Sequence, residues 1–217
     1  MILKKKQTLN DQIYEHIKTS ILNGEILQGE KIIPDELALK LNVSKTPIRD
    51  AINRLLQDRL LEKDTNSIFV HIMSDEEISM LEEAIIAQIL AGYRLCVLKG
   101  KRISLIHMLE QRLREQRDAI EIGDMKSNIK SAMEFDKSFV LETENIHLIQ
   151  NIERSFELFQ IMVANYQSDT DNQHISYEDH ADILQAAKNQ EIEVMEGLIM
   201  QHLHSSTQRV KQEIGRK

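Results

Sequence analysis

The sequence is poor in residues that interrupt helices or cross-link a chain. Its 217 residues include one cysteine, two prolines, seven glycines and no tryptophan, and aromatic residues make up only 4%. The lone cysteine, Cys96, excludes an internal disulfide framework. Because proline, glycine and aromatics are scarce while Leu, Ile, Glu and Gln abound, the composition favours helices over a β-sandwich. We therefore expect a mainly α protein.

Long apolar runs are also missing. No window is long and apolar enough for a membrane span, and the basic start of the chain lacks the apolar segment of a secretory signal. We therefore expect no membrane partner and a cytoplasmic location.

The distribution of charge matters more than the net value of −8, which alone argues against a nucleic-acid partner. Residues 1–73 hold 8 Lys and 3 Arg against 5 Asp and 5 Glu, a net charge of +1. The remainder holds 16 basic and 25 acidic residues, a net charge of −9. A locally basic edge in the first segment can attract phosphate while the acidic remainder keeps the protein in solution.

The first 73 residues have the pattern of a winged helix-turn-helix. Apolar residues at helical spacing predict helices at 8–23, 34–41 and 44–59, and Asn42-Val43 forms a tight turn between the last two. Two short β-like runs, 60–63 and 68–72, follow with turn-forming residues between them. Three helices and a small β-hairpin in this order predict a DNA-binding domain over residues 1–73.

The third of these helices has the features of a recognition helix. Ser44, Lys45, Thr46 and Arg49 occupy the outer side of its first turns, and its other face is aliphatic. Arg49 can donate two parallel hydrogen bonds to a guanine edge, and Lys45 can meet a guanine or a phosphate. The alternative is an ordinary amphipathic helix whose charges are merely solvated. The ordered set of helix, turn, helix and hairpin favours DNA binding.

From residue 74 onward the pattern predicts helices only. The capping-box-like Ser74-Asp75-Glu76-Glu77 opens the segment, and a polar stretch from Ser168 to His174 is expected to separate two helices. The predicted helices are 75–99, 101–122, 125–143, 146–167, 176–189 and 191–213. We expect residues 74–217 to form an antiparallel all-helical bundle with an interior large enough for a ligand.

The first segment resembles the GntR family of regulators. The resemblance rests on Ile21-Leu22-Asn23-Gly24-Glu25-Ile26, Gly29-Glu30-Lys31, Glu36-Leu37-Ala38 and Val43-Ser44-Lys45-Thr46-Pro47-Ile48-Arg49-Asp50-Ala51-Ile52. It implies that Lys45, Thr46 and Arg49 contact DNA and that the wing tip, at Ser67, reaches the minor groove. The chain departs from the family pattern at Lys45, where Arg is usual, at Gln28, where Pro is usual, and at Ser67, where Gly is usual.

The second segment is similar to the all-helical ligand domain of the FadR-like branch, the FCD domain. Many such domains hold a divalent metal, which in turn holds a carboxylate ligand. By resemblance Asp136, His180 and His202 occupy three of the four ligand positions, and Val140 occupies the fourth. This implies a divalent metal such as Zn²⁺ or Ni²⁺ bound by an incomplete set. The alternative is a pair of interior histidines hydrogen-bonded to Asp136 or to the ligand. Ile78 stands where many relatives have an arginine, which indicates an altered ligand class.

Taken together, the sequence predicts a transcriptional regulator that binds a palindromic operator in double-stranded DNA as a homodimer. A small-molecule effector, for which a carboxylate is one candidate, would modulate that affinity by linkage. One alternative is an effector-independent DNA-binding protein with a decayed pocket. Another is a metal-dependent hydrolase, supported only by Asp136, His180 and His202, with no second carboxylate placed as a general base. We predict that the chain is not an enzyme.

Overall fold

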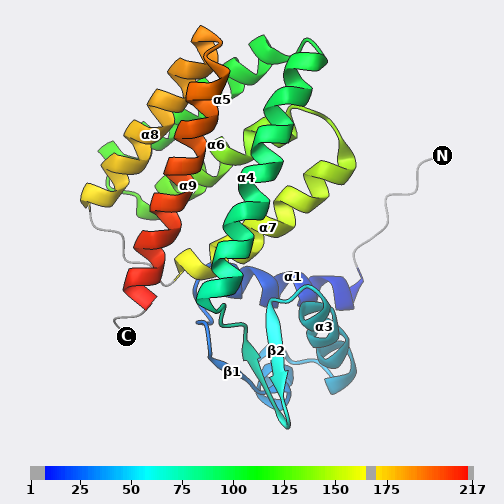
Figure 1. The fold of residues 1–217 in the computed structure, drawn as a ribbon. Helices are drawn as coiled ribbons and strands as arrows, with labels where there is room; N and C mark the ends of the chain where they lie inside the picture. Colours follow the sequence, from blue (N-terminus) through cyan, green and yellow to red (C-terminus); the bar gives the residue numbers. More distant parts are fainter. Residues whose placement is uncertain (1–7, 165–169, 215–217) are drawn as a thin grey trace, which may run out of the picture. The chain divides into compact units, whose positions relative to one another are not determined.

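The structure is a computed structural model that describes residues 8–164 and 170–214, and these form two compact units (Figure 1). The first unit holds the described residues up to Ser74 and those of α7 from Glu157, and the second holds the others. The elements of the first unit are α1 (Leu9–Leu22), β1 (Lys31–Ile32), α2 (Pro34–Leu41), α3 (Lys45–Gln57), β2 (Leu61–Asp64) and β3 (Ser67–Val70). The helices that follow are α4 (Asp75–Leu98), α5 (Arg102–Glu121), α6 (Met125–Leu141), α7 (Ile146–Ala164), α8 (Thr170–Asn189) and α9 (Ile192–Ile214). The predicted class, mainly α with a small sheet, is confirmed.

The first unit is a helical core edged by a small antiparallel sheet. A capping box between Thr8 and Asp11 starts α1. Ile17 of α1 and Ile48 and Leu55 of α3 are completely or almost completely buried in one shared core. The sheet has the order β1-β3-β2, and its third strand, β1, was missed because a two-residue strand leaves no alternating pattern in the sequence.

The turn between α2 and α3 positions the predicted recognition helix. Pro34 stands at the first position of α2, where its missing N–H costs nothing. At the other end Asn42 adopts the left-handed conformation (φ 51°), which asparagine tolerates better than most residues. The chain is thereby redirected into α3, which begins at Lys45, one residue after the predicted start, and ends at Gln57, two residues before the predicted end.

The second unit is built from helices that contact each other in a closed order. α4 packs on α6 and α9, α9 on α8, α8 on α5, and α5 on α6. The aromatic rings of Tyr93, Phe135 and Phe139 meet edge to face inside it, with centroid distances of 6.1 and 6.4 Å. None of the helices in the described ranges is long and apolar enough to cross a membrane.

One helix boundary differs clearly from the sequence prediction. α8 begins at Thr170, six residues before the predicted start, so the expected break between Ser168 and His174 is helical from Thr170 onward. Ser168 and the predicted end of the preceding helix at 165–167 lie outside the described residues. The polar composition of this stretch suggested a loop, but polar residues without Pro or Gly are also compatible with a solvated helix turn.

Gly92 allows α4 to lie unusually close to α6. A Cβ at this position would lie 2.5 Å from the carbonyl oxygen of Phe139 and 3.1 Å from Cγ2 of Val140. The first distance is shorter than any ordinary contact, and the atom it meets belongs to backbone that cannot rotate away. Gly92 therefore helps to determine where α6, and with it Asp136, lies in the bundle.

We predict that Gly92→Ala destabilises the chain by about 1–3 kcal/mol, because the added methyl group must push α4 away from α6. Gly197→Ala is the matched control, since Gly197 is also helical but a Cβ there meets nothing within 4 Å. The control should be neutral or stabilising by up to about 1 kcal/mol, since alanine has the higher helix propensity. Thermal and urea unfolding of both variants measure the difference. Equal stability of the two variants would contradict the close-approach argument.

Candidate functional site

The first turns of α3 present polar side chains to solvent, as the sequence predicted. Ser44, Lys45, Thr46 and Arg49 are all exposed, while the following residues of the inner face are buried. Ser44 is the N-cap residue with extended backbone (φ −70°, ψ 162°), but its hydroxyl makes no capping hydrogen bond. The start of α3 therefore has backbone N–H groups and a hydroxyl that are available to an incoming phosphate.

The two basic residues of this face differ in their surroundings. Lys45 Nζ pairs with Asp35 Oδ2 at 2.7 Å, and both side chains are more than half exposed. An ion pair so exposed contributes little and is easily exchanged for another partner. Arg49 makes no hydrogen bond or ion pair with any part of the chain that the structure describes. Arg49 is therefore the basic side chain most free to reach a base edge.

The wing is the hairpin of β2 and β3, with Ser67 paired to Asp64 at its tip. Its left-handed residue is Thr65 (φ 32°), and Ser67 has no positive φ. The backbone of the tip therefore does not need the glycine that the family usually has at position 67. Ser67 itself is partly exposed at the start of β3.

In the second unit, Asp136 of α6, His180 of α8 and His202 of α9 converge in the interior. Ligand atoms of the three residues all lie within 4.8 Å of one another, and all three side chains are buried. The two Nε2 atoms are 3.0 Å apart, and Asp136 Oδ1 and Oδ2 lie 3.6 and 3.7 Å from Nε2 of His180 and His202. The three residues singled out in the sequence are thus brought to one point.

Residues outside this cluster determine which ring nitrogens face its centre. Nδ1 of His180 lies 2.8 Å from Oε1 of Gln116, and Nδ1 of His202 lies 3.0 Å from Oδ2 of Asp179. Both partners are acceptors, so each Nδ1 carries a proton and each Nε2 faces the centre of the cluster. Phe135 stacks on the His180 ring, with centroids 4.2 Å apart, and restricts its rotation.

The electrostatics of the cluster favour one positive charge beside a negative Asp136. Burial would raise the pKa of Asp136, but the imidazoles of His180 and His202 outweigh it and hold that pKa below its usual value. Burial would lower the pKa of His202, but Asp136 and Asp179 outweigh it and raise the pKa to about 9. Burial and the neighbouring His202 lower the pKa of His180. One proton therefore lies between the two Nε2 atoms, donated by His202 to His180.

These residues fit a divalent metal ion. Once the proton shared by the two Nε2 atoms has left, two imidazole nitrogens and one ionised carboxylate are the donors that Zn²⁺ and Ni²⁺ accept. Both imidazoles have acceptors on their far nitrogens. Val140, at the fourth position, lies one turn after Asp136 and is completely buried. It offers no ligand atom, so three residues of the described ranges supply the ligands.

Sequence reasoning missed Gln116 and Asp179. Asp179 directly precedes His180, and Gln116 is a polar residue in a mostly apolar stripe of α5. Both features could have drawn attention in the sequence, but neither shows its hydrogen-bond partner without the fold. Ile78, the position where relatives have an arginine, is only 1% exposed and packs in the core of the helical unit. Its side chain supplies no donor to a ligand.

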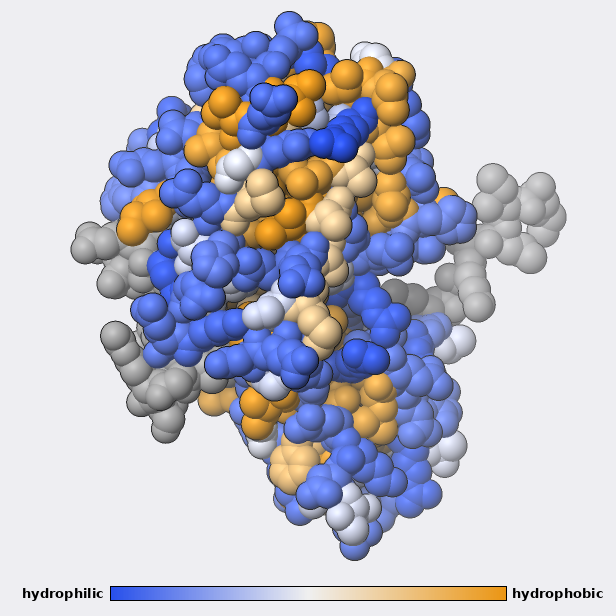
Figure 2. All heavy atoms as spheres, viewed as in Figure 1, coloured by the Kyte–Doolittle hydropathy of each residue, from blue (hydrophilic) through white to orange (hydrophobic). Residues whose placement is uncertain are grey.

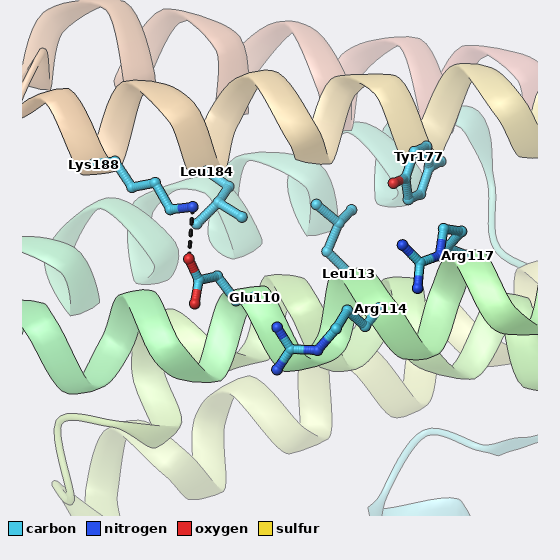
Figure 3. A pocket seen from close by; sticks show the side chains of 7 residues that line it. All are labelled: Glu110, Leu113, Arg114, Arg117, Tyr177, Leu184 and Lys188. Carbon is cyan, nitrogen blue, oxygen red and sulfur yellow. Dashed lines mark ion pairs between the residues drawn. The ribbon is translucent and has the colours of Figure 1, made fainter.

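The helical unit also has a surface groove of about 290 Å³ between α5 and α8 (Figure 3). It is lined by Glu110, Leu113, Arg114, Arg117, Tyr177, Leu184 and Lys188. An ion pair of 2.6 Å between Glu110 and Lys188 crosses one end of it. The groove lies outside the buried cluster and contains none of the three candidate ligands.

We predict that metal binding competes with the proton held by His202. Below pH 9 the metal must displace that proton, so the affinity for Zn²⁺ should rise as the pH rises from 6 to 8, by up to about tenfold per pH unit. Calorimetry at three pH values, in buffers of different ionisation enthalpy, should show release of about one proton per metal. His204→Asn removes an exposed histidine of the same helix and should leave this dependence unchanged. An affinity independent of pH would exclude the protonated pair as the metal site.

Comparison with known proteins identifies both units. The family described as "Bacterial regulatory proteins, gntR family" matches residues 9–70, and the FCD domain matches residues 90–205. The HTH-type transcriptional repressor RspR of Escherichia coli K12 is 24% identical over 226 residues, covering 97% of this chain and 92% of its own. The uncharacterized HTH-type transcriptional regulator YdhC of Bacillus subtilis is 26% identical over 203 residues, covering 92% and 90%.

Solved structures show the same fold. Escherichia coli McbR/YncC superposes with a TM-score of 0.78 at 18% identity, covering 96% of this chain and all of its own. Lar, which controls the expression of the Listeria monocytogenes agr system, superposes with a TM-score of 0.68 at 18% identity, covering 96% and 99%. The relatives are transcriptional regulators and not enzymes, so the hydrolase alternative is set aside. The chain belongs to the GntR family of bacterial transcriptional regulators, with an N-terminal helix-turn-helix domain and a C-terminal FCD domain.

Proposed function

We propose that this regulator binds a palindromic operator as a homodimer through residues 1–73, and that a metal-held effector in residues 74–217 modulates the affinity. The observation that carries the DNA-binding part is the exposed start of α3, where Arg49 has no partner among the described residues. In a helix-turn-helix domain this end of the second helix enters the major groove.

The proposed DNA contacts are of two kinds, contacts to base edges and contacts to the sugar-phosphate backbone. Arg49 would read a base, because its guanidinium can donate two parallel hydrogen bonds to a guanine. Lys45 would exchange its exposed pair with Asp35 for a phosphate or a guanine. Ser44 and Thr46 would contact the backbone beside the helix N-terminus, and Ser67 would bring the wing tip to the minor groove.

The effector part rests on the buried cluster. Asp136, His180 and His202 would hold a divalent ion such as Zn²⁺ or Ni²⁺, which supplies a positive centre for an anionic ligand when it is bound. Because the protein contributes three ligands, a carboxylate of the effector has a coordination position to occupy. An effector that binds the helical unit differently in its DNA-bound and free states would alter operator affinity by linkage.

The homodimer would form through the helical domain. α4 and α9 pack against each other, and both carry exposed apolar residues, among them Met80, Leu98 and Val194. Figure 2 shows apolar side chains gathered on the side of the helical unit where these two helices lie. Apolar side chains on adjacent helices suit a second copy, and a two-fold dimer presents two recognition helices to a palindromic site.

We predict that Arg49→Ala lowers specific operator affinity by about 1–3 kcal/mol and relaxes the base preference at one position in each half-site. Arg114→Ala is the control, because it removes the same charge from the helical unit. Operators selected from random DNA, followed by titration at matched salt, measure both effects. An Arg49→Ala protein that selects and binds the wild-type operator normally would refute the assignment.

We predict that the full chain sediments as a dimer at micromolar concentration and that Val194→Glu shifts it toward monomer, because a charge in an apolar interface loses its water. Ile122→Glu serves as control, since Ile122 is also exposed but follows the end of α5. Analytical ultracentrifugation distinguishes the species. A monomeric wild-type chain would contradict the dimer, and a dimeric Val194→Glu chain would place the interface elsewhere.

A further inference from the structure

Helix α5 presents two polar residues at positions where a bundle helix normally presents apolar ones. Its inner stripe consists of Leu105, Leu109, Arg112, Gln116 and Ala119, spaced four, three, four and three residues apart. This spacing keeps all five on one helix face. The leucines, Gln116 and Ala119 are buried, and Arg112 is partly buried. Two adjacent positions of a core-facing stripe are thus occupied by hydrogen-bond donors.

Gln116 uses only half of its amide. Its Oε1 accepts from Nδ1 of His180 at 2.8 Å, whereas its Nε2 is buried without a hydrogen-bond partner in the described part of the chain. The side chain is completely buried. A buried donor without an acceptor is unfavourable, so its retention beside the cluster points to an acceptor that the protein does not supply.

Arg112 has the same property one turn earlier. Its Nη1 pairs with Glu115 at 2.7 Å toward the outside of the helix, while its Nε is buried and has no partner among the described residues. The guanidinium remains charged at any physiological pH. Arg112 and Gln116 therefore direct two unused N–H groups from the same face of α5.

We propose that Arg112 Nε and Gln116 Nε2 form an oxyanion subsite for a carboxylate ligand, and that Gln116 also positions His180. The inference rests on the proposed metal-held effector and names the residues that recognise it. A carboxylate suits the subsite because it has acceptor oxygens for both donors and a negative charge for the guanidinium. The donors come from α5, whereas Ile78 of α4, where relatives carry an arginine, supplies none.

The two roles of Gln116 can be separated by substitution. Gln116→Glu keeps an acceptor for the His180 Nδ1 proton but removes the N–H donors and adds a negative charge. Zn²⁺ affinity should therefore stay at or above the wild-type value while carboxylate affinity falls at least about tenfold. Gln116→Met removes the acceptor as well, so Zn²⁺ affinity should fall about 10–100-fold. Gln185→Met, at an exposed glutamine of α8, is the control and should alter neither affinity.

The experiment measures Zn²⁺ affinity by calorimetry and then titrates acetate into the Co²⁺-loaded chain, following the ligand-field absorption of the metal. Arg112→Met should bind metal normally but bind acetate about tenfold more weakly. Arg114→Met is the control: Arg114 lies two residues later on α5 and is exposed, so this variant should behave as wild type. Thermal unfolding of each metal-free variant checks that it folds.

The possible outcomes distinguish failure of the carboxylate subsite from failure of the proposed metal-held effector. A wild-type chain that binds neither Zn²⁺ nor Co²⁺ overturns the metal-held effector and the subsite together. A wild-type chain that binds metal but does not respond to acetate overturns the subsite alone. Normal acetate binding by Gln116→Glu or Arg112→Met removes that residue from the subsite, and normal Zn²⁺ binding by Gln116→Met overturns the positioning of His180.

Discussion

The burial of the Asp136 carboxylate among α6, α8 and α9 is the constraint on which the helical unit depends. An ionised carboxylate deprived of water is destabilising by several kcal/mol unless donors and opposite charge surround it. Here the imidazoles of His180 and His202 lie beside it, and Asp179 holds the far side of His202. A proton or a divalent cation can supply the compensating positive charge, so the same geometry accommodates either.

Much of the surrounding packing serves to bring these three side chains together. They come from positions 136, 180 and 202, on three different helices, α6, α8 and α9. Gly92 lets α4 approach the backbone of α6 one turn from Asp136, and Phe135 covers the His180 ring. A small change in helix position would separate atoms that must lie within a few ångströms of one another, because a metal ion tolerates little variation in ligand distance.

The candidate DNA-reading face follows a different logic. Ser44, Lys45, Thr46 and Arg49 belong to one helix end, so a single N-cap and one turn of helix bring them to the same surface. The opposite side of α3 must also be apolar enough to pack in the core of the first unit. Ile48, Ala51 and Leu55 meet this requirement. Local order therefore suffices for this face, whereas the buried cluster needs the whole bundle.

The sequence by itself determined the class of fold, most helix limits and the family, because helical spacing, caps and the segment around Lys45 to Arg49 are local properties of the chain. It also singled out Asp136, His180 and His202, though only through their family resemblance. The short strand β1 depended on its pairing with β3, and the polar residues at the start of α8 are compatible with either a helix or a loop, so the sequence pattern was ambiguous at both places. Only the tertiary structure decided that Gln116 and Asp179 orient the two imidazoles. It also decided that α4 approaches α6 closely at Gly92, and that Arg112 and Gln116 each keep an N–H group without a partner among the described residues. The physical reason is that a 3.6-residue period shows which face of a helix is buried, but not which side chain of another helix it will meet.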